Sequence, residues 1–253
     1  MTKTTSILFI FVFLLGLSVK GVSANHSWGG YHWARTANPF NLRLGDNLSS
    51  NWKPFLTTTS NDWSASSILN TNVVSGQARK NCSATPGQVE VCNKKYGNNG
   101  WLGIAQVWVN GLHITQGLTK MNDTYFNTPR YNTTAWKNLV LCQEVGHTLG
   151  LDHQDEVFDN PNMGTCMDYT NNPETNQHPN AHDYEELETI YVHLDTTTTL
   201  SQTSNQTVRQ TVLDDLENAS QWGRLISNNG KVAKYERQMF DGSKVFTFVV
   251  WAE

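Results

Sequence analysis

The stretch Q-E-V-G-H-T-L-G-L-D-H, which begins at Gln143, places several metal-binding groups at the spacing of a helix followed by a turn. Positions four apart share one face of a helix, so Gln143 and His147 point the same way, with Glu144 one step round the axis. Gly150 can adopt the positive φ that ends a helix sharply, and the turn would bring His153 back to the same point. The pattern predicts a metal site at which Glu144 is free to transfer protons.

This stretch resembles the zinc-binding signature H-E-x-x-H-x-x-G-x-x-H of the metzincin zinc peptidases, with Gln143 in place of the first histidine. Farther along, the run G-T-C-M-D-Y, from Gly164 to Tyr169, resembles the Met-turn of the same clan. A lone histidine is usually a surface or core group, but the agreement of two elements favours the metzincin interpretation. The resemblance covers about residues 40–194. It implies an α+β, metzincin-like zincin domain with a twisted mixed sheet, an active-site helix and a C-terminal helix after the Met-turn.

The resemblance also implies roles for individual residues. Glu144 would be the general base, and His147 and His153 would bind one catalytic zinc ion. Met167 would form an apolar floor beneath the ion, and Gly150 would permit the turn between the two histidines.

Gln143 leaves three arrangements open, because a neutral amide oxygen is a poorer donor than imidazole. Either Gln143 ligates zinc weakly, or another residue takes its place, or the metal is lost. Tyr169 is the best substitute, since a tyrosine two residues after the Met-turn methionine approaches zinc in the astacin and serralysin branches of the clan. Matrix-type members lack this tyrosine, and a core aromatic below the site is the other interpretation of Tyr169.

Polar residues outside the motif carry weaker signals. An acidic loop could hold calcium, as matrix-type domains do, although its spacing matches no recognised calcium loop; its members are Asp155, Glu156 and Asp159. The histidines outside the motif are interpreted as surface or structural groups; they include His113, His178, His182 and His193.

The first 24 residues have the pattern of a signal peptide. Lys3 precedes an apolar run from Ile7 to Leu17, which is shorter than the roughly 18 apolar residues that span a bilayer. We therefore expect a secreted, extracellular chain with no membrane partner. Cleavage would remove two of the 18 basic residues and no acidic residue, leaving 16 against 22. This negative balance argues against nucleic acid as a partner.

The cysteines of an exported chain are expected to form disulfides, and there are four of them, an even number. Their order along the chain leaves three pairings open. Because the metzincin fold brings Cys142 and Cys166 together under the metal, the resemblance implies the pairs Cys142–Cys166 and Cys82–Cys92. Seven N-x-S/T sequons would make the chain a glycoprotein in a eukaryotic host; they lie at Asn25, Asn47, Asn81, Asn122, Asn132, Asn205 and Asn218.

The domain organisation follows from composition. The expected units are a signal peptide at 1–24, a metzincin-like catalytic domain at 25–195, a polar linker at 196–207 and a small β-rich C-terminal extension at 208–253. The linker is rich in threonine, and turn signals separate β-rich runs in the extension. The extension matches no recognised family, and we expect it to pack on the catalytic domain.

Two β-rich runs, at 103–109 and 113–118, are separated by the hairpin signal Asn110-Gly111. The first resembles the metzincin strand that edges the cleft and pairs with extended substrate. The predicted function is a secreted, monomeric, zinc-dependent endopeptidase that hydrolyses peptide or protein with metal-activated water and a glutamate base. The alternative, which Gln143 favours, is a catalytically weak or inactive metzincin-fold protein that binds a protein or glycan in the same cleft.

Overall fold

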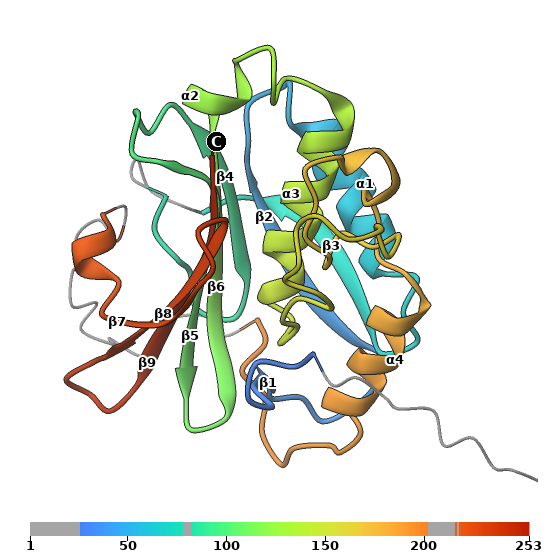
Figure 1. The fold of residues 1–253 in the computed structure, drawn as a ribbon. Coiled ribbons are helices and arrows are strands. Elements are labelled where there is room, and N and C mark those ends of the chain that lie inside the picture. The colour runs from blue at the N-terminus through green and yellow to red at the C-terminus, as the bar shows by residue number, and fades with distance from the viewer. Residues whose placement is uncertain (1–25, 78–81, 202–215, 217, 253) are drawn as a thin grey trace, which may run out of the picture.

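One continuous mixed sheet runs through the chain and includes its C-terminal residues. The computed structural model describes residues 26–77, 82–201, 216 and 218–252 (Figure 1). Within these residues, nine strands form a sheet of order β3-β2-β4-β6-β5-β9-β8-β7, and β1 pairs with β6 beside this path. The strands are β1 (His32–Trp33), β2 (Phe40–Asn47), β3 (Leu69–Ser75), β4 (Val89–Lys94), β5 (Trp101–Asn110), β6 (His113–Asn122), β7 (Arg224–Asn228), β8 (Val232–Gln238) and β9 (Lys244–Trp251).

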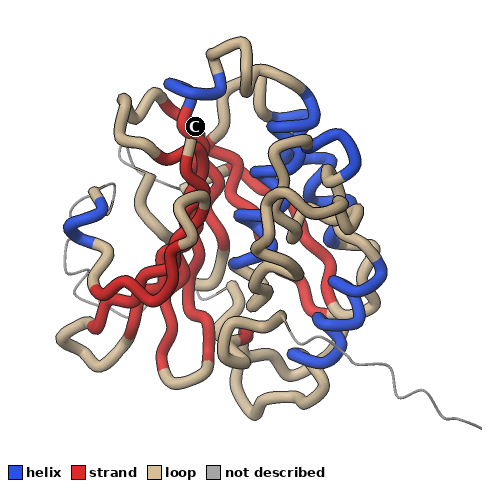
Figure 2. The backbone as a smooth tube through the Cα atoms, viewed as in Figure 1, coloured by secondary structure: helices blue, strands red, loops and turns tan. Residues whose placement is uncertain are grey.

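The longer helices lie together on one side of this sheet (Figure 2). The helical segments are α1 (Lys53–Trp63), α2 (Asp123–Phe126), α3 (Thr134–His147), η1 (Pro173–Thr175), α4 (Ala181–Ile190) and η2 (Ala219–Gln221). Helix α3 contacts α1, β5, β6 and β9, so it is held between another helix and the middle of the sheet. The architecture is therefore mixed α+β, as the sequence predicts.

The prediction that residues 103–109 form a free cleft edge is wrong. β5 pairs antiparallel with β6 on one side and with β9 on the other, in a register that runs from Trp101 opposite Trp251 to Val109 opposite Lys244. The physical reason is that β9 is itself a strongly apolar run that needs a partner. Pairing with β5 removes both the exposed edge and the exposed apolar residues.

The sheet is buried on both faces around β5. Leu102 and Val107 belong to the core cluster shared with the helices, whereas Ile104 and Trp108 belong to a second cluster with Trp222. Full burial of each such side chain stabilises the fold by roughly 1.5–3 kcal/mol. The C-terminal strands are therefore part of the hydrophobic core rather than a loosely attached module.

Several expectations fall partly or wholly outside the described residues. The predicted signal peptide, 1–24, lies outside them, as do residues 202–207 of the predicted linker. Residues 196–201 run along the domain, where the amide of Thr199 donates to the carbonyl of Ala34 at 3.0 Å. The domain division stays a prediction. Among the described residues, no helix combines the length and the apolar character that a membrane span requires.

One sequon is incompatible with a glycan in this fold. Asn122 is fully buried, and its amide nitrogen donates to the carbonyls of Gly97 and Trp101 at 3.1 Å each. Its side-chain oxygen caps α2 by accepting from the amide of Thr124. Glycosylation of Asn122 would require this whole corner to open.

Candidate metal centre

Helix α3 begins and ends as the sequence predicts. Its N-cap is Thr133, whose side chain accepts from the amide of Trp136. At the other end the indoles of Trp28 and Trp33 donate to the carbonyls of His147 and Thr148 at 3.0 and 2.9 Å. These bonds pair carbonyls that the helix itself leaves without a partner.

The turn after α3 depends on Gly150. Its φ is +101°, a region that side chains with a Cβ rarely adopt, and a Cβ there would lie 2.4 Å from the carbonyl oxygen of Tyr31. The turn reverses the chain and brings the ring of His153 to 4.6 Å from that of His147 between centroids. The two histidines of the motif are thus neighbours.

A disulfide and a methionine pack against α3. The structure joins Cys142 to Cys166, and Cys82 to Cys92, the pairs expected from the sequence. Met167 follows directly and is fully buried; a Cβ on Gly146 would lie 2.5 Å from its sulfur. Met167 therefore packs closely against the last turns of α3.

His147 is fixed in the form that can bind a metal. Its Nδ1 lies 2.9 Å from the carbonyl oxygen of Leu151, which only an N–H can satisfy, so the proton sits on Nδ1 and Nε2 keeps a lone pair. Burial, together with the positive charge of His153, holds the pKa of His147 well below its usual value. The imidazole is therefore neutral at pH 7.

Tyr169 lies beside the second histidine. Its ring centroid is 4.4 Å from that of His153, and its hydroxyl is buried. Burial, reinforced by the negative charge of Glu144, raises the pKa of the Tyr169 phenol well above 10. Without a bound cation the phenol therefore keeps its proton.

Glu144 is buried beneath β5. A Cβ on Gly103 of β5 would lie 2.7 Å from its Oε1, so glycine leaves the space that this carboxyl group fills. Burial raises the pKa of Glu144 well above its ordinary value. Gln143 is also buried, and it lines a cavity of about 20 Å³ with Tyr169 and Trp251, room for about one water molecule.

The polar atoms of this centre lack the partners that buried groups normally have. Within the described part of the chain, no hydrogen-bond partner faces the Nε2 of His147 or of His153, the hydroxyl of Tyr169 or either oxygen of Glu144. The Nδ1 of His153 faces two carboxylate oxygens, of Asp152 at 3.5 Å and of Glu156 at 3.8 Å. Imidazole nitrogens and a phenol oxygen are suitable zinc donors, and a carboxyl group beside them can bind water. The residues present therefore fit a zinc ion.

The C-terminal strands cover this centre. The ring of Phe248, on β9, stacks on His147 with centroids 4.2 Å apart and an interplanar angle of 11°. Lys234, on β8, pairs with Asp152 at 2.5 Å, next to His153. Neither residue could be identified from the sequence. A β-rich run gives no sign that it will cover a site whose residues lie far from it along the chain.

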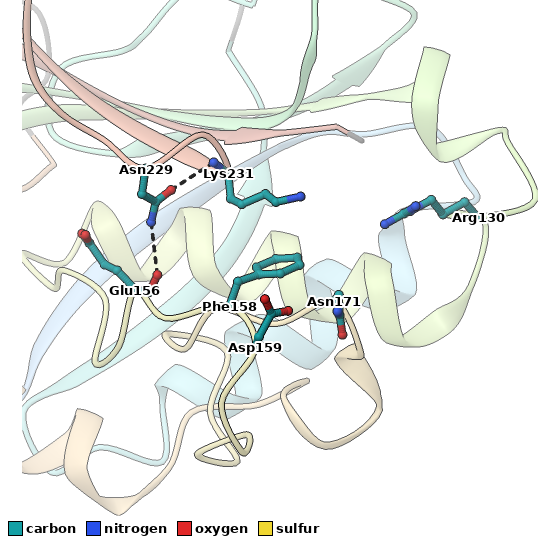
Figure 3. A pocket seen from close by; sticks show the side chains of 7 residues that line it. All are labelled: Arg130, Glu156, Phe158, Asp159, Asn171, Asn229 and Lys231. Carbon is teal, nitrogen blue, oxygen red and sulfur yellow. Dashed lines mark hydrogen bonds between the residues drawn. The ribbon is translucent and has the colours of Figure 1, made fainter.

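The acidic loop lies at the outer side of the site. A cavity of about 600 Å³ lies there, and its lining includes Glu156, Phe158 and Asp159. The side-chain nitrogen of Asn229 donates to the backbone carbonyl of Glu156 at 3.2 Å, a bond drawn in Figure 3. Among the described residues, Glu156 is the one member of the loop whose ligand atom converges with others; its neighbours are Asp152 and His153. A calcium site formed by all three loop carboxylates stays a prediction.

Comparisons with known proteins define no family for this mixed α+β protein. No family model and no curated protein matches the chain. Two solved structures of myroilysin are similar to it in part. The first has a TM-score of 0.37 at 11% sequence identity and covers 62% of this chain and 82% of its own. The second has a TM-score of 0.36 at 12% identity and covers 68% and 96%.

Gly150→Ala tests the turn that builds the centre. We expect this variant to lower the free energy of unfolding by more than about 1 kcal/mol, because the new methyl group meets both an unfavourable φ and a backbone oxygen. Urea unfolding measures the loss. Gly97→Ala is the matched control, since Gly97 has a φ of +91° but open space around its Cβ position. Equal losses in both variants would show that contact with Tyr31 contributes nothing.

Proposed function

We propose that the chain is a secreted, zinc-dependent endopeptidase whose metal centre uses His147, His153 and Tyr169. The observation that carries this proposal is that the rings of His147 and Tyr169 both lie against that of His153, with buried polar atoms that lack hydrogen-bond partners among the described residues and that a cation would satisfy. The two disulfides support an oxidising, extracellular setting. Tyr169 is proposed in place of Gln143 because its hydroxyl is buried without a partner and its ring lies against His153.

When bound, zinc supplies Lewis-acid chemistry, which polarises a carbonyl group and makes water nucleophilic near neutral pH. Glu144 takes the proton from the attacking water and gives it to the departing amine. The bond from His147 to the carbonyl of Leu151 fixes the ring so that Nε2 keeps its direction during turnover. Gly103 leaves the space in which the Glu144 carboxyl group lies.

A second candidate function is a non-catalytic protein that uses the same fold to bind a protein or glycan. Two observations favour it. Gln143 replaces a stronger ligand, and Phe248 lies face to face with His147 where a substrate would need access. The two candidate functions predict different effects of replacing Glu144. An endopeptidase would lose peptide cleavage, whereas a binding protein would change at most in stability.

Glu144→Gln separates them. This variant should keep its zinc and lose peptide cleavage by about 10²- to 10⁴-fold, because an amide cannot carry the proton. Metal analysis of the purified protein, run beside cleavage of a fluorogenic peptide library with and without a chelator, gives both readouts. His147→Ala should lose zinc and cleavage together. Protein that cannot be loaded with zinc, or unchanged turnover in Glu144→Gln, contradicts the endopeptidase proposal.

The identity of the third ligand is tested by exchanging two side chains. We expect Tyr169→Phe to weaken zinc binding by about 10- to 100-fold and Gln143→Ala to leave it unchanged. Gln143→His should add an imidazole and restore tight binding in the Tyr169→Phe background. Competition with a zinc-sensitive dye measures all of these affinities. The reverse pattern, with Gln143→Ala weak and Tyr169→Phe normal, would assign the third position to Gln143.

A further inference from the structure

A second group of metal-binding side chains lies away from the centre described above, where β1, β6 and the segment after α4 meet. The Nε2 atoms of His32 and His193 are 3.2 Å apart. The Oδ1 of Asp195 lies 3.5 Å from His32 Nε2, 3.8 Å from His193 Nε2 and 3.0 Å from His113 Nε2. Three imidazoles from three distant parts of the sequence thus surround one carboxylate oxygen.

The donors are held in position by other groups. His32 is buried, and its Nδ1 donates to the carbonyl of Gly30 at 2.9 Å, which leaves the Nε2 lone pair directed at the cluster. The other oxygen of Asp195 accepts from Arg35 Nη1 at 3.0 Å and from the Arg35 amide at 3.2 Å. Arg35 therefore orients the carboxylate so that Oδ1 faces the imidazoles.

From this arrangement we propose a zinc site formed by three ligands, His32, His193 and Asp195. A tetrahedral zinc with donors at 2.0–2.1 Å places those donors about 3.3 Å from one another. The separations among the three ligand atoms, 3.2–3.8 Å, lie close to this value. A cation also resolves the contact between the His32 lone pair and a carboxylate oxygen, two acceptors that otherwise repel.

We expect a zinc ion at this site to stabilise the fold and to take no part in hydrolysis. The site joins β1, which already pairs with β6, to the segment that follows α4, where Arg35 also donates to the carbonyl of Tyr191 and to Asp195. Since zinc would bind the folded chain and not the unfolded one, it should raise the melting temperature by roughly 5–10 °C at a hundredfold excess over its Kd.

Zinc stoichiometry and melting temperature test this site in the full-length protein, with His147→Ala as background so that only one site remains. This background should bind one zinc per chain and melt higher with zinc. Adding His193→Ala or His32→Ala should abolish both effects. His178→Ala is the matched control: the His178 side chain is 54% exposed and pairs with Asp62 at 2.7 Å, compared with 53% for that of His193, and it should change neither readout.

Two outcomes would overturn the proposal. One is a His147→Ala protein that binds no zinc at micromolar free metal and melts at the same temperature with or without it. The other is equal zinc binding by the His193→Ala, His32→Ala and control proteins. Either result would mean that this cluster does not bind zinc.

A second inference concerns the covered centre, and it rests on the proposed function. β9 pairs with β5 from Trp101 to Val109, so β5 could offer an edge to an extended peptide only if β9 left it. At the middle of this pairing Phe248 stacks on the metal-binding histidine His147. β9 thus occupies the backbone hydrogen-bonding positions along one side of β5, and its Phe248 occupies the space next to the proposed metal position.

One ion pair joins the β8–β9 hairpin to the site, beside the apolar packing of Phe246 and Phe248 on Trp28. In it Lys234 pairs with Asp152, and its Nζ lies 5.8 Å from the centroid of the Phe248 ring. At the hairpin's far end, Lys244 pairs with Glu236 of the same hairpin, at 3.3 Å. Loss of the Lys234 contact would therefore weaken docking without changing the hairpin itself.

We infer that the β8–β9 hairpin is an internal inhibitor that occupies the substrate position, and that cleavage of peptide requires β9 to leave β5. Displacement by a partner or by proteolysis would then activate the enzyme. Strand exchange on β5 makes substrate binding and inhibition mutually exclusive, since one edge accepts one strand.

Two variants of the intact chain test whether the hairpin inhibits cleavage. One links β5 to β9 by a disulfide that can be reduced, and the other removes the ion pair between Lys234 and Asp152. The double variant Gln106→Cys/Thr247→Cys links β5 to β9 at positions whose side chains are 3.3 Å apart, and it should be inactive until mild reduction restores wild-type cleavage. Wild type with the same reductant is its control. Lys234→Ala should cleave about 2- to 5-fold faster than wild type. Lys244→Ala, which removes an ion pair within the hairpin, should not.

Hydrogen exchange distinguishes failure of this inference from failure of the proposed function. The inference requires β9 amides to exchange faster than β6 amides, and faster still in Lys234→Ala, whether or not any peptide is cleaved. A locked protein with wild-type activity would overturn the inference, as would equal protection of β9 and β6 in every variant. If Lys234→Ala exchanges faster and binds zinc yet no form cleaves peptide, the hairpin is mobile and the endopeptidase proposal is wrong.

Discussion

The centre depends on one backbone constraint, the reversal of the chain at Gly150. Everything around it is fixed relative to that turn: the indole caps on the end of α3, the contact between the rings of His147 and His153, and the approach of the Tyr31 carbonyl. A helix alone could present two side chains to one ion but not three groups from different directions. The turn supplies the second direction, and the segment fastened by the Cys142–Cys166 disulfide supplies the third.

The centre illustrates how burial governs polar groups. His147 becomes a neutral donor because its ring is desolvated and its other nitrogen is paired. The same desolvation raises the pKa values of Glu144 and Tyr169, so burial favours the protonated form of both groups. Solvent or a positive charge would shift both groups toward their ionised forms. Opening the site and binding metal would therefore both favour the ionised forms of Glu144 and Tyr169.

Local patterns in the sequence predicted local structure well. The end of α3 before Gly150 and the hairpin at Asn110-Gly111 follow from spacing and turn chemistry, and the resemblance implied the mixed α+β class. Long-range pairing was not predictable in the same way. β9 reads as an apolar strand, but no residue in it shows that β5 will be its neighbour, and the free edge was wrongly predicted for that reason. Likewise His32, His113 and His193 lie in three separate segments, so no spacing rule brings them together.

The place of β5 in the middle of the sheet also affects how the chain is made. Trp101 pairs with Trp251, so the second side of this central strand is covered only by a segment far along the chain. During synthesis that side is an apolar edge with unpaired amides and carbonyls, the feature most prone to pairing with other chains. Pairings of such high contact order form slowly. The nascent protein therefore has its greatest need of a chaperone between the synthesis of β5 and the arrival of β9.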